Sequence, residues 1–316
     1  MIIDRKTYRI IGLWIVFLSP FAISHSPLSA QTSMLSIGVR GGGQTFLPIA
    51  AVGASSDVSP NIGGAGTLDL RYVFYSYLTE RVALGFTVGA GIGYGGSGWN
   101  GTNTDKYTNT DYLGNKLDYT VSSRFRQTEN FAKADVSLLL SFRVGDFMIN
   151  LGPRFLLPFA TTATLTFDKA SIDAYYPKYK VHVVDKMITG VLETPYTSET
   201  QASLPQYNLL VTLELGREWS LGLRHSIGFN IFADVGVWNS GINTPTSNEP
   251  LVQVHPITDA SNPVPQVTVH SPAYMLSDRR HVELGIRIYY AFTAASSEKQ
   301  KLPRDSHSHR NRFMPQ

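Results

Sequence analysis

Residues 82–94, with the sequence VALGFTVGAGIGY, decide the fold of this 316-residue chain. Every second side chain from Val82 to Tyr94 is apolar or aromatic, whereas the residues between them are alanine, glycine or threonine. Successive side chains of a β-strand point to opposite faces, so the pattern predicts a strand with one oily face and one small, polar face.

Seven further stretches alternate in the same way, and together they predict eight strands. Short turns join the second strand to the third, the fourth to the fifth and the sixth to the seventh. The other connections are long and cover residues 42–65, 96–130, 158–204 and 238–279. An even number of strands with alternating short and long connections is typical of a transmembrane β-barrel, whose short turns face the periplasm. We therefore predict an all-β fold: an eight-stranded antiparallel up-and-down transmembrane β-barrel with four long extracellular loops.

The polar face of these strands carries charges of both signs. An eight-stranded barrel is just wide enough for side chains to fill its interior, so we expect these charges to form a paired polar network in the lumen. The network comprises Arg40, Asp69, Arg71, Lys133, Asp135, Arg143, Arg154, Glu214, Asp234, Glu283 and Arg287. The alternative is a soluble β-sandwich or lipocalin-like barrel. Such a fold points its apolar face into the core and does not need four long loops at one end.

The beginning of the chain is typical of a secretory signal peptide. Residues 1–30 combine a basic start, an apolar run over 10–23 and small residues up to Ala30. We expect cleavage after this segment, a barrel over residues 31–293 and a polar, disordered periplasmic tail over residues 294–316. Removing the three bases and one acid of the signal lowers the formal net charge from +3 to +1, which argues against nucleic acid as a partner. The chain has no cysteine, which argues against a lipoprotein anchor or a disulfide framework.

Motifs that could carry chemistry are weak. The glycines of residues 91–96 match a dinucleotide fingerprint, but no helix is predicted after them. His307 and His309 form an isolated pair in the polar tail, and His225 beside Ser226 lacks a third partner and an oxyanion donor. We therefore predict no catalytic residues, no cofactor, no metal site and a protein that is not an enzyme.

The last strand resembles the closing strand of known membrane barrels. Glu283, Gly285, Ile288 and Tyr290 follow the polar-x-Gly-x-x-apolar-x-aromatic pattern. On these residues the chain is similar to small outer-membrane β-barrel proteins of the outer-membrane protein A and porin-like kind, without a peptidoglycan-binding domain. The resemblance implies a Gram-negative outer membrane, contact with outer-membrane lipid, and a barrel assembly machinery that reads these four residues during biogenesis.

Two local features modify the simple barrel. The hairpin over residues 136–155 is similar to the central hairpin of porin-like proteins, but Pro153 removes a ladder donor, and we expect a β-bulge there. Within the long segment 96–130, the alternating apolar residues from Leu117 to Phe125 predict strands that continue beyond the bilayer.

Function is expected in the long loops. Residues 158–204 carry Tyr175, Tyr176 and Tyr179 near two lysines, a composition that suits contact with a surface protein or glycan ligand. The leading hypothesis is a non-enzymatic barrel whose loops mediate interaction or adhesion and whose body has a structural role in the envelope. The alternatives are a narrow porin-like channel for small solutes and, third, a lipid-modifying enzyme.

Overall fold

The structure is a computed structural model that describes residues 31–51, 57–111, 113–183, 192, 195–200, 204–222, 224–240, 251–255, 266–269 and 276–296. The predicted signal peptide and the tail beyond Ser296 lie outside the described residues. Within the described part, no helix is both long and apolar enough to cross a membrane.

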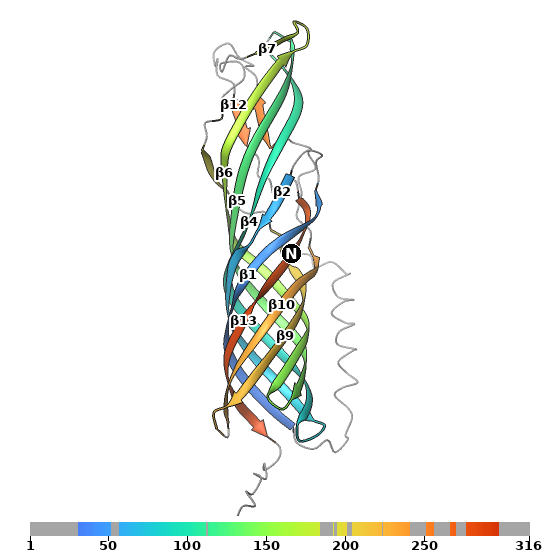
Figure 1. Cartoon of the computed structure of the whole chain (residues 1–316), viewed down its shortest axis with the longest axis vertical. Coiled ribbons are helices and arrows are strands. Elements are labelled where there is room, and N and C mark those ends of the chain that lie inside the picture. Colours follow the sequence, from blue (N-terminus) through green and yellow to red (C-terminus); the bar gives the residue numbers. More distant parts are fainter. Residues whose placement is uncertain are drawn as a thin grey trace, which may run out of the picture.

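Eight long strands form a closed antiparallel ring (Figure 1). In chain order they are β1 (Gln31–Ala51), β3 (Gly63–Tyr77), β4 (Val82–Thr110), β5 (Lys116–Val144), β6 (Phe147–Tyr176), β9 (Asn208–Ser220), β10 (His225–Asn239) and β13 (Leu276–Ser296). Each strand pairs with the next one in this series, and β13 pairs with β1 to close the ring. Closure gives every strand two hydrogen-bonded neighbours, as β-structure in hydrocarbon requires. The predicted eight-stranded barrel is confirmed.

The connections alternate in length as predicted. Short turns of residues 78–81, 145–146 and 221–224 lie at one rim of the barrel. Gly145 has a positive φ of 58°, which the two-residue turn between β5 and β6 requires and which glycine adopts at little cost. The other rim bears the long connections, which contain five short strands: β2 (Asp57–Asn61), β7 (Val181–Val183), β8 (Tyr196–Thr200), β11 (Val252–His255) and β12 (Gln266–Val269).

The outer wall of the barrel is an apolar belt. On β5 its members are the outward residues from Ala132 to Val144, and Leu140 is 67% exposed. At about 3.3 Å per residue and a tilt of about 45°, this run spans about 28 Å along the barrel axis, which matches the hydrocarbon thickness of a bilayer. Exposed aliphatic and aromatic side chains of this kind occur on all eight strands.

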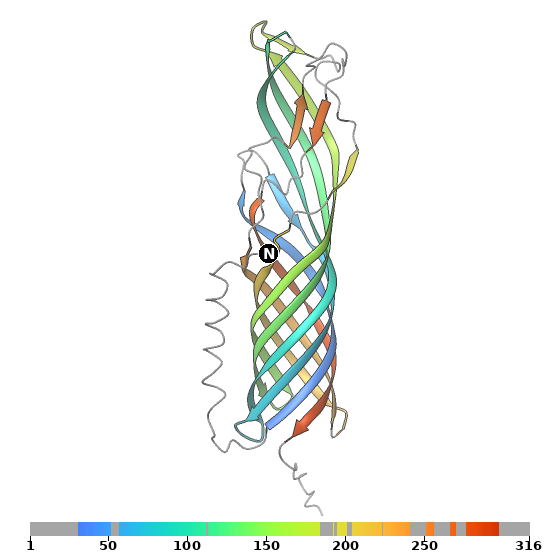
Figure 2. The same cartoon turned by 180° about the vertical axis from the view of Figure 1, so that it is seen from behind.

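Three strands extend far beyond this belt, as Figures 1 and 2 show. The segments predicted as loops, 96–130 and 158–204, are in large part the distal halves of β4, β5 and β6. The polarity of the two faces of the sheet reverses at the edge of the belt. On β5 the outward residues change from apolar below Asn130 to polar above it, and the inward residues become apolar, with Leu117 and Phe125 buried. The predicted continuation of strands beyond the bilayer is confirmed.

Two local predictions are wrong. Residues 42–51, which the predicted connection 42–65 placed in a loop, belong to β1 instead, because β1 stays paired with β13 to Ala51, with register shifts after Pro48. Glycine permits this close approach, since a Cβ on Gly42 would lie 2.2 Å from the carbonyl oxygen of Leu284. Pro153 does not cause a bulge either. Its strand keeps one register with β9 through Pro153, opposite Val211, so the missing donor is tolerated without an inserted residue.

Candidate functional site

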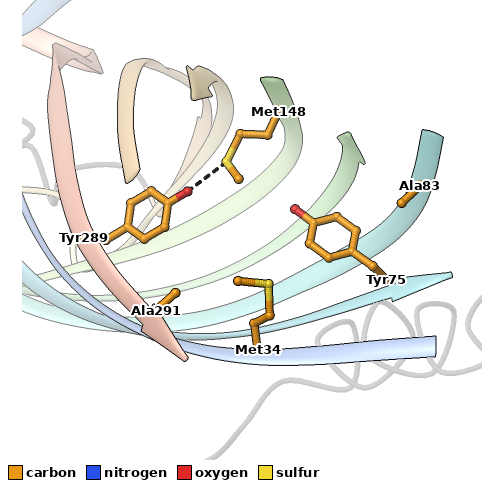
Figure 3. Close-up of a cluster of buried hydrophobic side chains, with 6 residues drawn as sticks. All are labelled: Met34, Tyr75, Ala83, Met148, Tyr289 and Ala291. Atoms are coloured by element: carbon orange, nitrogen blue, oxygen red, sulfur yellow. Dashed lines mark hydrogen bonds between the residues drawn. The ribbon is translucent and has the colours of Figure 1, made fainter. Parts of the chain in front are cut away.

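An apolar cluster fills the lumen at the short-turn end (Figure 3). Met34, Tyr75, Met148 and Tyr289 point toward one another from four different strands. Tyr289 donates its hydroxyl hydrogen bond toward Glu218, at 3.1 Å, and lies 3.2 Å from the sulfur of Met148. The cavity beside this cluster has a volume of about 20 Å³, close to the minimum for one water molecule. The lumen is therefore closed at this end.

Above this cluster, charged side chains fill the centre of the lumen. Arg71 donates to both carboxylate oxygens of Glu214, at 2.7 and 2.9 Å, and Asn150 and Asn230 donate to the same carboxylate. Asp69 accepts three hydrogen bonds from Arg287 at 2.8 to 3.1 Å and also pairs with Arg71. Two carboxylates and two guanidinium groups thus form one connected network.

A second network lies around Arg154, whose side chain is fully buried. Arg154 donates to Asp135 at 3.0 and 2.7 Å and also to Asp234, which pairs with Arg40 at 2.9 Å. Arg40 also stacks over the ring of Phe232, 3.7 Å from its centroid. Buried charges are tolerated when they are paired and hydrogen-bonded, as these are.

The structure thus brings each of the eleven sequence-predicted lumen residues into an ion pair. The remaining pairs are Lys133 with Glu283, at 2.7 Å, and Arg143 with Glu218, at 2.9 Å. Sequence reasoning missed Glu218, Glu129 and Arg279, although the last two form a buried pair at 2.8 Å. With these three included, seven bases and seven acids pair in and beside the lumen.

An aromatic cluster closes the other end of the charged region. Phe46, Trp99 and Phe131 are buried together, and Phe131 lies on β5 between the inward Lys133 and Glu129. The guanidinium of Arg279 lies 5.3 Å from the centroid of a Trp99 ring, a cation–π contact. The central lumen charges therefore lie between two clusters of apolar and aromatic side chains, whereas Glu129 and its partner Arg279 lie beyond Lys133, at the aromatic cluster.

Beyond the belt, the inner face of β4–β6 forms a second core. Val121, Phe125, Leu165 and Phe167 pack against Val252 of the β11–β12 hairpin. The hairpin lies against this concave sheet in both views of the molecule (Figures 1 and 2). This unit has an apolar interior and a polar exterior, as a water-soluble β-structure does.

Polar side chains of β4 fix the hairpin. Asp105 accepts hydrogen bonds from the backbone of Leu251 and Val252, at 2.8 and 3.4 Å. The Tyr107 hydroxyl accepts from the Val254 backbone N–H at 2.7 Å, and Asn109 donates to the Val254 carbonyl at 2.5 Å. The backbone of β11 is thereby held by side chains rather than by a neighbouring strand of the barrel.

Replacing Asp105 with alanine is expected to release this hairpin without unfolding the barrel. The change removes the acceptor of two backbone N–H groups, which costs about 1–3 kcal/mol when they stay buried. Hydrogen–deuterium exchange of residues 252–255 should then accelerate roughly tenfold or more, whereas exchange within β9 and β10 should not change. Equal protection of the hairpin in both proteins would contradict the role assigned to Asp105.

The hairpin also makes two tyrosines titrate late. Burial raises the pKa of Tyr107 to about 12 and that of Tyr119 to about 12, and the two rings stack 5.4 Å apart. Because the folded state favours the neutral phenol, their contribution to stability is complete below pH 10 and is lost between pH 10 and 12. Spectrophotometric titration should therefore detect one fewer late-ionising tyrosine in the Tyr107→Phe variant than in the unaltered chain. Loss of a tyrosine that titrates near pH 10 would contradict this assignment.

The tip of the extension gathers the tyrosines predicted to contact a ligand. Tyr176 donates to Asp111 at 3.1 Å, and Tyr179 is 54% exposed beneath the ammonium of Lys178. The rings of Tyr175 and His182 contact each other in a tilted arrangement, 4.8 Å between centroids, and His182 pairs with Asp173 at 3.1 Å. These groups come from β6, β7 and the turn between them, so they form one surface at the distal end of the sheet.

The other predicted motifs are placed as follows. His225 and Ser226 point to opposite faces of β10, since His225 is exposed and bonded to Tyr290 whereas Ser226 is buried. They do not form a catalytic pair. In the predicted assembly signal, Glu283 lies in the lumen, whereas Ile288 and Tyr290 belong to the outer belt. Gly285 lies against β1, where a Cβ would be 2.2 Å from the Gly41 carbonyl oxygen.

The chain matches no known protein family and no curated protein. Among solved structures it is similar to the outer membrane protease OmpT from Escherichia coli, at 8% identity and a TM-score of 0.26, covering 86% of this chain and 99% of that one. It is also similar to the translocator domain of the autotransporter NalP from Neisseria meningitidis, at 10% identity and a TM-score of 0.21, covering 90% and 95%. The Pseudomonas putida toluene transporter TodX follows at 9% identity and a TM-score of 0.15, covering 87% and 92%.

The closed ring, the apolar belt and the ionic interior together form the architecture of a transmembrane β-barrel. The prediction that excluded enzymatic activity is wrong. The solved structures to which this chain is similar include a protease as well as a transporter and a translocator domain, so the exclusion of catalysis is withdrawn.

Proposed function

We propose that this protein is a surface-interaction barrel of the Gram-negative outer membrane, which presents the distal end of β4–β6 to a protein or glycan ligand. One observation carries the proposal: three barrel strands continue beyond the belt and build a second core of their own. A barrel that only spans the membrane has no need of a folded extension. The exposed Tyr179, stacked with Lys178, and the Tyr175–His182 pair supply rigid aromatic contacts at its tip.

The test compares adhesion of cells that display different variants. Replacing Tyr175, Lys178 and Tyr179 with alanine should abolish binding to a printed glycan array or to immobilised extracellular-matrix protein. In the control variant, Thr102 and Thr104 are replaced with alanine instead; both lie on the outer surface of the same extension. Cells that display this variant should bind as cells with the unaltered chain do. Adhesion that survives the tip substitutions, with equal display on the cells, would contradict the proposal.

The alternative of a solute channel is disfavoured by the filled lumen. Arg154, Lys133 and Glu214 are buried in the lumen, and an aromatic and an apolar cluster enclose them. We expect the unaltered protein in a planar bilayer to show no discrete openings. Replacing Trp99 and Phe131 together with alanine should not introduce openings either, because the charged networks and the apolar cluster at the short-turn end still fill the lumen. Steady conductance from the unaltered chain would instead favour the channel.

The finer features of the class are part of the same proposal. Export would begin with cleavage of residues 1–30, and the barrel assembly machinery would recognise Glu283, Gly285, Ile288 and Tyr290 in the last strand. The resemblance to the outer-membrane protein A and porin-like kind rests on these four residues. Protease treatment of intact cells, with the cuts mapped, tests the orientation, since cuts are expected only in the long connections.

A further inference from the structure

A groove with a volume of about 270 Å³ lies on the outer wall where β2, β3, β4 and β5 meet. Its lining includes Gly64, Tyr94, Gly96, Thr128 and Asn130. A single water occupies about 30 Å³, so the groove has room for a ligand the size of a sugar ring.

The groove arises from a break in strand pairing. The ladder between β2 and β4 ends at Asn61 opposite Gly98, and the ladder between β3 and β4 ends at Ala65 opposite Gly95. Residues 62–64 therefore face only residues 96 and 97, an irregularity equivalent to a β-bulge. Glycines leave the wall bare at this point, and a Cβ built on Gly64 meets no atom within 4 Å.

The groove lies at the upper edge of the apolar belt. Tyr94 and Ala132 are the last outward belt residues on β4 and β5, and Asn130 and Thr128 follow on the polar side of the edge. Lipid headgroups lie at this level of a membrane, and tyrosine is enriched there. A ligand in the groove would thus have hydrocarbon on one side and water on the other.

Positive charge continues from the groove along the same outer face of β5. Arg126 and Arg124 follow Thr128 at steps of two residues, about 7 Å each, and both are exposed. Neither arginine has an ion pair with another residue that the structure describes. Arginine binds phosphate oxygens in a bidentate manner, so these two side chains suit an anionic phosphate group.

We propose that this groove binds the phosphorylated sugar headgroup of a glycolipid in the outer leaflet of the surrounding membrane. The sugar ring packs on Tyr94 beside Gly64 and Gly96, and its hydroxyl groups bond to Thr128 and Asn130. The phosphate lies against Arg126 and Arg124, and the acyl chains lie along the apolar belt below Tyr94. The site is separate from the distal tip and does not depend on the surface-interaction role.

The test uses the full chain purified in detergent, with bisphosphorylated lipid A as the probe and native mass spectrometry as the readout. Gly64→Trp fills the groove at a position where the backbone has room for a side chain. Arg124→Ala combined with Arg126→Ala removes the phosphate contacts. Each variant should bind lipid A roughly tenfold more weakly or worse, Gly64→Trp because the indole occupies the place of the sugar ring and the double arginine variant because the phosphate loses its charge-assisted hydrogen bonds.

Matched controls separate binding from folding. Gly222→Trp adds the same side chain in the turn between β9 and β10, at the opposite rim of the barrel, where a Cβ also meets nothing within 4 Å. Lys106→Ala with Lys116→Ala removes two bases from the same outer face, farther from the belt. Both controls should bind as the unaltered chain does, and heat-modifiable gel mobility verifies that every variant is folded. Equal affinity in all variants, or a loss shared by the controls, would overturn the site.

Two competing ligands test the chemistry of the proposal. The unaltered chain should bind lipid A without its phosphates more weakly than it binds bisphosphorylated lipid A. The double arginine variant should bind the two lipids equally. Free glucosamine 1-phosphate should compete only at far higher concentration, because it lacks the acyl chains that contact the belt. Full binding of the dephosphorylated lipid would overturn the role of the arginines, and competition by the free sugar phosphate at equal concentration would overturn the assignment to a membrane lipid.

Discussion

Replacing Arg154 with alanine is expected to destabilise the barrel by about 3–5 kcal/mol, the cost of leaving buried charges without their partner. Asp135 loses two hydrogen bonds at 3.0 and 2.7 Å, and Asp234 keeps only Arg40 of its two arginine partners. No water replaces the guanidinium easily, because two clusters of apolar and aromatic side chains enclose this region. Urea unfolding of the protein in phospholipid vesicles, followed by tryptophan fluorescence, measures the change.

The matched control is an arginine that is paired but exposed. Arg217 lies 3.3 Å from Asp146 at the short-turn rim, with both side chains about half exposed. Its replacement with alanine should cost no more than about 1 kcal/mol, as for other surface ion pairs. A double variant, Arg154→Met with Asp135→Leu, should recover part of the lost stability, because it removes the buried carboxylate together with its partner. Equal effects of Arg154→Ala and Arg217→Ala would contradict the enclosed network.

Alternation along the chain was sufficient to predict the ring of strands and their continuation around Leu117 to Phe125, but it did not predict the full length of the extension. In β5 the apolar residues lie at outward positions from Val144 to Ala132, whereas beyond Ala132 the apolar residues lie at inward positions, which they share with the polar Glu129, Gln127 and Ser123. An apolar pattern that is sought only on the lipid-facing side therefore ends at Ala132, and residues beyond it are interpreted as a loop. The physical reason for the exchange is the solvent, since the same sheet faces hydrocarbon below the edge and water above it.

The same limit explains the missed lumen residues. Glu129 has the inward parity of Lys133 and Asp135, and Arg279 has that of Glu283, but both lie in segments predicted as loops. Glu218 shares the inward parity of Glu214 but lies near the end of β9, at the predicted short turn between the sixth and seventh strands. Continuing the parity of each strand past the belt would have found all three. Which acid pairs with which base depends on the stagger of the strands, and alternation alone does not determine that stagger.

Introducing arginine at Leu140 is expected to cost about 2–4 kcal/mol of folding free energy in a bilayer. Leu140 lies within the outward run from Ala132 to Val144, two residues from its midpoint, and points away from the barrel. Charged side chains on the lipid face of a barrel carry this penalty at the bilayer midplane, and it falls to about 0–1 kcal/mol near the interfaces. Arginine at Ala132, at the edge of the belt, should therefore cost much less. Equilibrium folding into phospholipid vesicles measures both changes.

Thr120 supplies the control on the same strand and the same face, beyond the belt edge. Thr120→Arg should change the folding free energy by less than about 0.5 kcal/mol, because the side chain stays in water and lies opposite Asp173 of β6. If Leu140→Arg cost no more than Thr120→Arg, the outer wall would not face hydrocarbon. A fold with its aliphatic rows in a soluble core predicts a different order, in which arginine at Ala132 costs as much as at Leu140. The dependence on depth along one strand thus distinguishes a membrane-spanning barrel from a water-soluble one.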